Sequence, residues 1–169
     1  VQANCYNNIV TNNSKTGISG LFVCARPSGT ICNFYDNQIH SNSNTTTAGA
    51  SQGGSIIGVN CSSSGTQTAN VYQNKVFNLS AAGTAGTVAG LQASGAVNVN
   101  FYNNFVSDLR APAATTATNG QSVTGINITG GTKANLFFNS VYLNASSTGA
   151  NFWTAAVFPT TSGTTPPTL

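Results

Sequence analysis

The chain has 169 residues, of which only 4% are charged and 40% are hydrophobic, and its formal net charge is +3. An average soluble protein carries about 25% charged residues, so the polarity of this chain comes instead from Asn, Thr, Ser and Gly, which favour turns. The cations are scattered and the apolar stretches are far shorter than the roughly 18 residues of a membrane-spanning helix, so neither a nucleic-acid partner nor a membrane span is expected.

An eight-residue motif begins near the start of the chain and occurs five times without gaps. Its consensus is a small or apolar residue, Asn, an apolar residue, an aromatic residue, a variable residue, Asn, a variable residue, and Val or Ile. The copies are residues 3–10, 32–39, 69–76, 99–106 and 134–141. Asn fills the second position in every copy, as Asn4, Asn33, Asn70, Asn100 and Asn135. Asn also fills the sixth position in every copy, as Asn8, Asn37, Asn74, Asn104 and Asn139.

A second, shorter motif with Gly at its third position alternates with the first. It occupies residues 18–21, 56–59, 88–91 and 123–126, with a degenerate copy at 154–157. The sixth-position Asn residues are 29, 37, 30 and 35 residues apart. Constant motifs at elastic spacing indicate a rigid repeated unit with variable loops. The Thr-, Ala-, Ser- and Gly-rich residues 42–54, 81–87 and 110–122 are expected to form these loops.

Apolar and polar residues alternate within the motif, for example in residues 71–76 and 99–101, which indicates strands with one buried face. Abundant Gly, Asn and β-branched residues disfavour helices, and the connections are too long for hairpins. The sequence therefore predicts an all-β fold, a right-handed parallel β-helix (β-solenoid) of about five coils with long loops on one side. The coils fall at roughly residues 1–30, 31–68, 69–96, 97–131 and 132–169, and the stack is expected to continue at both ends.

In such a stack each coil lies roughly 4.8 Å above the last, so equivalent residues form rows. The sixth-position Asn row is expected to point inward at a turn, because stacked amides bond to one another whereas stacked charges repel. The second-motif Gly is expected to permit a bend or close packing of coils. Two apolar rows fill the predicted core. They are Val10, Ile39, Val76, Val106 and Val141, and Cys5, Phe34, Val71, Phe101 and Leu136.

These residues resemble the parallel β-helix repeat of the pectate-lyase-like superfamily, whose short form alternates a Gly-Ile strand with an Asn-Asn-x-Ile turn. The loop-extended form is similar to repeat regions in very large secreted proteins of Bacteroidota-type bacteria. The resemblance covers nearly the whole chain and implies an extracellular or cell-surface location. It does not by itself imply an activity, since one fold carries many functions.

An enzyme is not expected. Glycoside hydrolysis normally needs two facing carboxylates, and the chain has no Glu and only Asp36 and Asp108, at different places in the repeat. The superfamily's catalytic residues have no matching positions, and no cofactor is implied. His40 could serve as a ligand or a pH switch, but a single solvated histidine is the favoured interpretation. Four Cys and one His without C-x-x-C spacing predict no metal site.

The cysteines are candidates for two disulfides between coils. Cys24 and Cys61 follow the second-motif Gly by four and three residues, and Cys5 and Cys32 occupy neighbouring inward places of the first motif. Stacked inward positions approach the Cα separation that a disulfide needs. The alternatives are a Cys24–Cys32 bridge across one turn and four buried thiols that fill the core.

The aromatic row is the sharpest candidate for a binding surface. It consists of Tyr6, Tyr35, Tyr72, Tyr102 and Phe137. By alternation it points away from the core, where it could bind a sugar or a partner. The favoured alternative is that a long loop folds over this row and buries it.

Two classes of function remain. The first is a structural or adhesive segment of a secreted or cell-surface protein or extracellular filament, and it is favoured. The second is a module that binds, or less readily degrades, a polysaccharide. An ice-binding face is a remote third. Because neither end carries a recognisable cap, the expected partners are flanking repeats or further copies of the chain, joined end to end, with carbohydrate as a further candidate.

Overall fold

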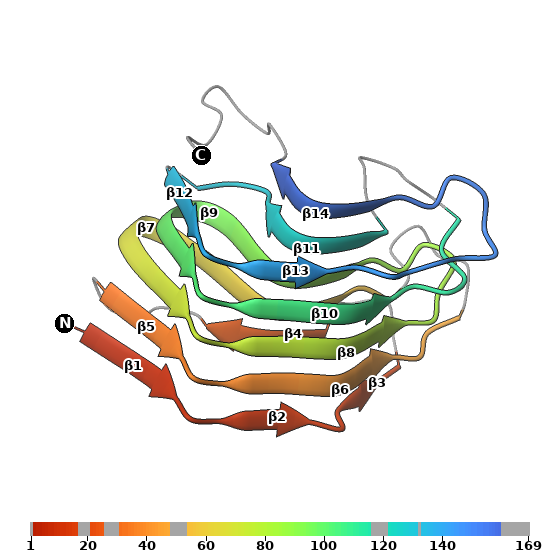
Figure 1. Ribbon diagram of the computed structural model, residues 1–169, viewed down its shortest axis with the longest axis horizontal. Coiled ribbons are helices and arrows are strands. Elements are labelled where there is room, and N and C mark those ends of the chain that lie inside the picture. Colours follow the sequence, from red (N-terminus) through yellow and green to blue (C-terminus); the bar gives the residue numbers. More distant parts are fainter. Residues whose placement is uncertain are drawn as a thin grey trace.

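The computed structural model describes residues 2–16, 21–25, 31–47, 54–115, 122–131 and 133–159, with the backbone alone for 21–25, 63–66 and 95–97. Every regular element in these ranges is a β-strand (Figure 1). The strands are β1 (Gln2–Tyr6), β2 (Ile9–Thr11), β3 (Ser14–Lys15), β4 (Leu21–Ala25), β5 (Ile31–Tyr35), β6 (Gln38–Asn44), β7 (Ile56–Tyr72), β8 (Lys75–Ala81), β9 (Val88–Tyr102), β10 (Phe105–Arg110), β11 (Val123–Ile128), β12 (Lys133–Phe137), β13 (Ser140–Tyr142) and β14 (Thr154–Pro159).

The strands stack into three faces. The first face contains β1, β5, the ends of β7 and β9, and β12, and the second contains β2, β6, β8, β10 and β13. The third face contains β4, the beginnings of β7 and β9, β11 and β14. All of these pairings are parallel, so each level of the stack, here called a rung, places one copy of the first motif over the next.

The predicted all-β parallel solenoid is therefore confirmed, with one correction to the coil count. The chain makes about four turns, not five. The five motif copies mark five rungs, and four steps separate them, because the first and last copies begin and end the stack of the second face (β2-β6-β8-β10-β13).

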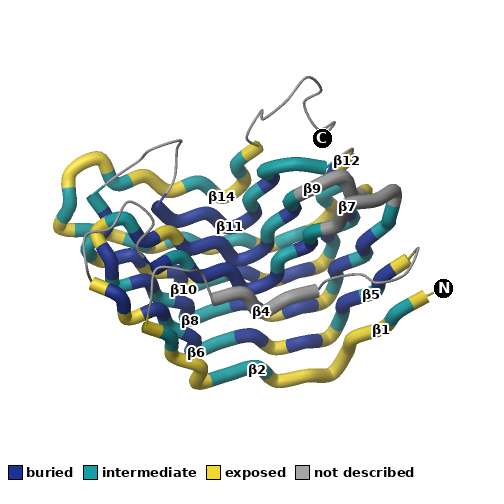
Figure 2. Tube along the Cα trace, turned by 180° about the vertical axis from the view of Figure 1, so that it is seen from behind, coloured by how far each residue is buried: buried dark blue, intermediate teal, exposed yellow. Residues whose placement is uncertain are grey.

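The core lies between the three faces, and its residues are most deeply buried in the middle rungs (Figure 2). The apolar residues of both predicted core rows are buried in these rungs, with Ile39, Val71, Val76, Phe101 and Val106 at 0% exposure. Val10, Leu136 and Val141 in the outer rungs are partly buried and pack against them. Both predicted core rows are confirmed in the middle rungs, because strand alternation fixes which side chains face inward. Cys5, the first member of one predicted row, is exposed on the first rung.

The second-motif glycines let the third face approach the Val row of the second face. A Cβ on Gly90 would lie 2.4 Å from Val106 Cγ1 and 2.8 Å from the carbonyl oxygen of Gly125. Gly58 faces Val76 and Gly125 faces Val141 in the same way. The predicted close packing is confirmed: any larger side chain there would overlap its neighbours.

Long connections leave the strands of the second face on one side of the solenoid, among them residues 82–87 and 143–153 (Figure 1). The predicted loop at 81–87 is confirmed from residue 82 onward. Of the predicted loops 42–54 and 110–122, residues 42–44 and 110 belong to β6 and β10, and residues 48–53 and 116–121 lie outside the described residues. These loops also stack: Thr115 N donates to Thr84 O at 2.7 Å, and Thr148 N donates to Pro112 O at 3.1 Å.

Candidate functional site

The sixth-position asparagines form a continuous inward ladder at the corner between the first and second faces. Asn37, Asn74 and Asn104 are at most 1% exposed. Each Asn Oδ1 accepts two hydrogen bonds from the rung before it, one from the backbone N–H and one from the side-chain Nδ2 of the equivalent Asn, at 2.9–3.1 Å. The predicted inward ladder is confirmed in all five rungs.

The same amides also hold the backbone of the corner. Asn74 Nδ2 donates to Phe34 O at 2.9 Å, and Asn104 Nδ2 donates to Val71 O at 2.9 Å. An interior ladder Asn therefore connects the rung before it to the rung after it. Each buried amide must be fully hydrogen-bonded, because a polar group without a partner in the core strongly destabilises the folded state.

The second-position asparagines form another ladder on the outer surface of the first face. Asn33, Asn70, Asn100 and Asn135 each donate Nδ2 to Oδ1 of the Asn in the preceding rung, at 2.7–2.9 Å. Donation in this outer ladder runs toward the N-terminal rung, whereas in the inner ladder it runs toward the C-terminal rung. The sequence predicted that both rows stack, and hydrogen-bond geometry alone reveals the opposite polarity.

The outward aromatic row lies next to the outer Asn ladder. The rings of Tyr6, Tyr35, Tyr72 and Tyr102 form a column, with neighbouring centroids 4.7–5.0 Å apart and interplanar angles of 4–8°. Phe137 aligns with Tyr102 on the last rung. In these four tyrosines, here called the tyrosine column, each interior ring covers its neighbours' faces, and every residue of the column stays at least partly exposed.

The favoured expectation that a loop buries this row is wrong. Tyr6 and Phe137 are 51% and 50% exposed, and Tyr35, Tyr72 and Tyr102 are of intermediate exposure. The described loops 82–87 and 143–153 follow the second-face strands β8 and β13 and lie on the other side of the solenoid (Figure 1). Spacing along the chain could not show this, because it does not say at which end of a strand a loop turns back.

Burial raises the pKa of Tyr72 and Tyr102 above the usual value of 10.0. For Tyr72 the neighbouring Tyr102 and Tyr35 and the carboxylate of Asp36 add to this effect. Desolvation and nearby negative charge both disfavour a phenolate. The phenols of Tyr72 and Tyr102 are therefore neutral at physiological pH.

The residue before each inner-ladder Asn adopts a left-handed backbone, which sequence reasoning treated as merely variable. The φ angles in this corner row are 53–57°. The row consists of Asn7, Asp36, Gln73, Asn103 and Phe138. Left-handed φ is tolerated best by Asn, Asp and Gly, and the three Asn or Asp residues at this position were the signal that could have revealed the turn.

A second corner row with positive φ interrupts the second face at Asn12, Ser41, Asn78 and Asp108. The residues after it point inward. In the first two rungs these are Asn13 and Asn42, whose amides make a short ladder at 2.9 Å, and in the next two they are Leu79 and Leu109. The repeat motif does not reveal this ladder, because Leu replaces Asn in its later rungs.

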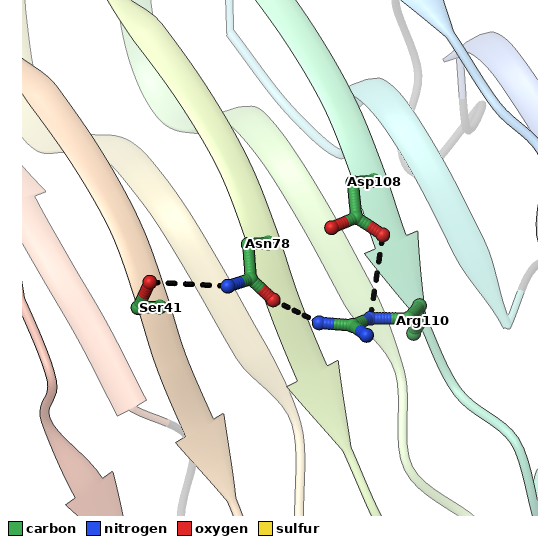
Figure 3. Close-up of polar contacts among 4 residues, drawn as sticks. All are labelled: Ser41, Asn78, Asp108 and Arg110. Carbon is green, nitrogen blue, oxygen red and sulfur yellow. Dashed lines mark hydrogen bonds and ion pairs between the residues drawn. The ribbon is translucent and has the colours of Figure 1, made fainter.

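Polar side chains run along the outside of this second row across three rungs (Figure 3). Asn78 Nδ2 donates to Ser41 Oγ at 3.0 Å, Arg110 donates to Asn78 Oδ1, and Arg110 Nε lies 3.4 Å from Asp108 Oδ1. The Arg110 and Asp108 side chains are about half exposed. Exposed pairs of this kind contribute little to stability.

The two acidic residues predicted to lie apart do so in the described structure. Asp36 occupies the first corner row on the second rung, whereas Asp108 pairs with Arg110 on the fourth. His40 stacks on Phe77, with centroids 4.6 Å apart, and its Nδ1 lies 3.2 Å from Thr11 Oγ1. In the described part of the chain, no three His, Cys, Asp or Glu side chains are grouped to hold a metal ion.

The strand registers correct the expected cysteine stacking. Cys24 aligns with Asn60 and Cys61 with Ala25, one position away from the register that a Cys24–Cys61 bridge requires. Ala3, not Cys5, aligns with Cys32. Cys5 is an exposed free thiol, so the Cys5–Cys32 bridge is not formed. The Cys24 side chain, and with it the Cys24–Cys32 alternative, lies outside the described residues.

An apolar groove of about 360 Å³ opens at the last rung. It is lined by Ile126, Leu136, Phe138, Asn139, Val141, Ala156 and Val157. Leu136, Val141 and Asn139 are the last-rung members of the core rows and the inner ladder, Phe138 is the last member of the corner row, and the rest belong to β11 and β14. The groove is therefore the cross-section of the solenoid core.

Within the described residues, no helix has the length and apolarity needed to cross a membrane. No protein-family model, curated protein or solved structure matches the chain. The relation to the pectate-lyase-like superfamily and to bacterial repeat proteins thus stays a prediction from the repeat motif, and the parallel β-solenoid fold stands on the geometry of the chain itself.

Proposed function

We propose that the chain is a non-catalytic structural repeat segment of a secreted or cell-surface protein, serving as a rigid spacer in an adhesin or an extracellular filament. One observation carries this proposal: both asparagine ladders run without a break from the first rung to the last. Hydrogen bonds that continue through every rung stiffen the stack along its axis.

The inner ladder supports this role because its bonds are shielded from water. Asn74, with 0% exposure, bonds to Phe34 O in the rung before it and to Asn104 Oδ1 in the rung after it. Separating two rungs would leave several buried polar groups unpaired at once, each at about 1–3 kcal/mol. A stack held in this way resists stretching along its axis.

We further propose that the solenoid joins end to end with a second copy of itself. Asn8 and Asn139 are the end members of the inner ladder, Asn8 as its first donor and Asn139 as its last acceptor. Asn4 and Asn135 hold the corresponding ends of the outer ladder. A second copy whose Asn8 follows Asn139 would continue the inner ladder, and its Asn4 would donate to Asn135 Oδ1 in the outer ladder. Each ladder has a donor end and an acceptor end, so a head-to-tail orientation makes both contacts complementary at once.

Sedimentation velocity across a concentration series, with electron microscopy of the same samples, tests this contact. We expect species that lengthen along one axis at constant width. Asn8→Ala, which removes the acceptor offered to a second copy, should weaken the association, whereas Asn144→Ala on an exposed loop should not. A strictly monomeric chain, or association that Asn8→Ala leaves unchanged, would contradict the end-to-end contact.

Polysaccharide binding is the weaker alternative. Sugars bind to the faces of aromatic rings, and the interior rings of the tyrosine column have both faces covered by their neighbours. A glycan array with the whole chain separates the two functions. The structural proposal expects no saturable binding. Binding that is lost in the double variant Tyr72→Ser, Tyr102→Ser, at unchanged thermal stability, would replace it with the carbohydrate function.

A further inference from the structure

The tyrosine column brings four of the five tyrosines of the chain together on one exposed edge. Parallel register aligns Tyr6 with Tyr35, Tyr35 with Tyr72, and Tyr72 with Tyr102. Neighbouring rings are nearly parallel, at 4–8°, and their centroids are separated by 4.7–5.0 Å. The fifth tyrosine, Tyr142, lies on the second face and is 63% exposed.

This arrangement places reactive carbon atoms next to one another. One-electron oxidation of a phenol, with loss of its proton, gives a tyrosyl radical whose unpaired spin lies partly on the ring carbons beside the hydroxyl. Two such radicals couple through these carbons to form one C–C bond. Each coupled carbon then releases its hydrogen as a proton while a phenolic oxygen regains one, so the pair loses two electrons and two protons in all.

We propose that the tyrosine column is an oxidative modification site, at which a peroxide-dependent one-electron oxidant couples tyrosines of successive rungs into dityrosine. Hydrogen peroxide accepts the two electrons and two protons and becomes two water molecules, which balances the reaction. The inference does not depend on the proposed structural role.

Proximity favours coupling within the column over coupling between molecules. Fixing two reacting groups side by side gives an effective concentration far above that of free chains in dilute solution. The strand register fixes the Tyr35 and Tyr72 backbones, and intermediate exposure leaves the rings room to tilt toward each other. The raised pKa of Tyr72 and Tyr102 keeps both phenols neutral, so no charge repulsion separates the rings before oxidation.

The test treats the whole folded chain, at low micromolar concentration, with a haem peroxidase and hydrogen peroxide. We expect dityrosine fluorescence and an intact monomer mass lower by two hydrogen atoms per bond. Peptide mapping should join Tyr35 to Tyr72 or Tyr72 to Tyr102. The reaction of the same chain unfolded in urea should give markedly less bond formation within the monomer.

Phe variants supply the matched controls because they keep the ring stack but not the phenol. The double variant Tyr35→Phe, Tyr72→Phe leaves no two adjacent tyrosines in the column and should reduce intramolecular dityrosine to background. Tyr142→Phe should leave the yield unchanged. Circular dichroism verifies that each variant stays folded. Equal yields in the double variant and the native chain, or cross-links formed only between molecules, would overturn the proposal.

Discussion

The backbone N–H and the side-chain Nδ2 of Asn74 donate to the same atom, Oδ1 of Asn104, at 3.1 and 3.0 Å. One acceptor thus fixes both the backbone and the side chain of the rung before it. The amide is suited to this role because its oxygen accepts two bonds while its nitrogen donates two. An aspartate would lack the donors, and a stack of carboxylates would repel itself in the dry core.

Removing a central ladder amide should therefore be costly. Asn74→Ala deprives the Asn37 backbone N–H and side chain of their common acceptor, and Asn37 and Asn74 are only 1% and 0% exposed. Since each orphaned buried group costs about 1–3 kcal/mol, we expect a loss on the order of 3 kcal/mol in the free energy of unfolding. Urea titration measures it. The exposed end residue Asn8 is the control: Asn8→Ala should cost less than about 1 kcal/mol, and equal losses would argue against burial as the cause.

A methyl group at Gly90 should strain the packing between two faces. The added Cβ would lie 2.4 Å from Val106 Cγ1, and overpacking of this kind costs about 1–3 kcal/mol. Val106→Ala alone creates a cavity, but it should recover part of the loss when combined with Gly90→Ala. The free energies of unfolding of the native chain, the two single variants and the double variant give the coupling energy between the two positions. Strictly additive effects would show that Gly90 is needed for some other reason.

The left-handed corner should rank substitutions at Gln73 by backbone preference. Gln73 is exposed, with a φ of 57°, so its side chain contributes little packing. Asn tolerates this region better than Gln, and β-branched Val tolerates it worst. We expect Gln73→Asn to raise the melting temperature slightly and Gln73→Val to lower it, with a difference of about 1–2 kcal/mol between them. Calorimetry measures the order, and a more stable Val variant would contradict it.

The tyrosine column should make the fold sensitive to alkaline pH. The pKa values of Tyr72 and Tyr102 are raised in the folded chain above 10.0, so the folded state holds its phenolic protons longer than the unfolded state does. Their contribution to stability is complete below pH 10 and is lost as the pH rises through the folded-state values. Chemical denaturation at a series of pH values above neutrality measures the decline.

The double variant Tyr72→Phe, Tyr102→Phe is the control for this pH dependence. It keeps the ring stack but removes the two phenols whose pKa is raised. Between about pH 10 and 11.5, its free energy of unfolding should fall less steeply than that of the native chain. Both proteins are compared at the same ionic strength. Parallel curves for the two proteins would place the alkaline sensitivity elsewhere.

Much of the fold could be predicted from the sequence because the repeat can be recognised there without any structural information. Asn at two fixed positions in five copies requires equivalent residues to stack, and alternation around Val71 and Phe101 determines which rows face the core. The glycine motif likewise predicted close packing, and the structure shows that its neighbour is the Val row. These are local constraints: strand alternation and amide pairing act within one rung and its neighbours.

Other properties depended on how the rungs meet in three dimensions. The register that separates Cys24 from Cys61 comes from the irregular pairing of β4 with β7, which the spacing from a Gly could not reveal. The exposure of the tyrosine column depends on the side of the solenoid on which the loops leave. The opposite polarities of the two ladders depend on how each amide is rotated. The sequence alone determined which residues repeat; the tertiary structure decided what each row contacts, because register, loop direction and side-chain rotation are set by packing between distant segments.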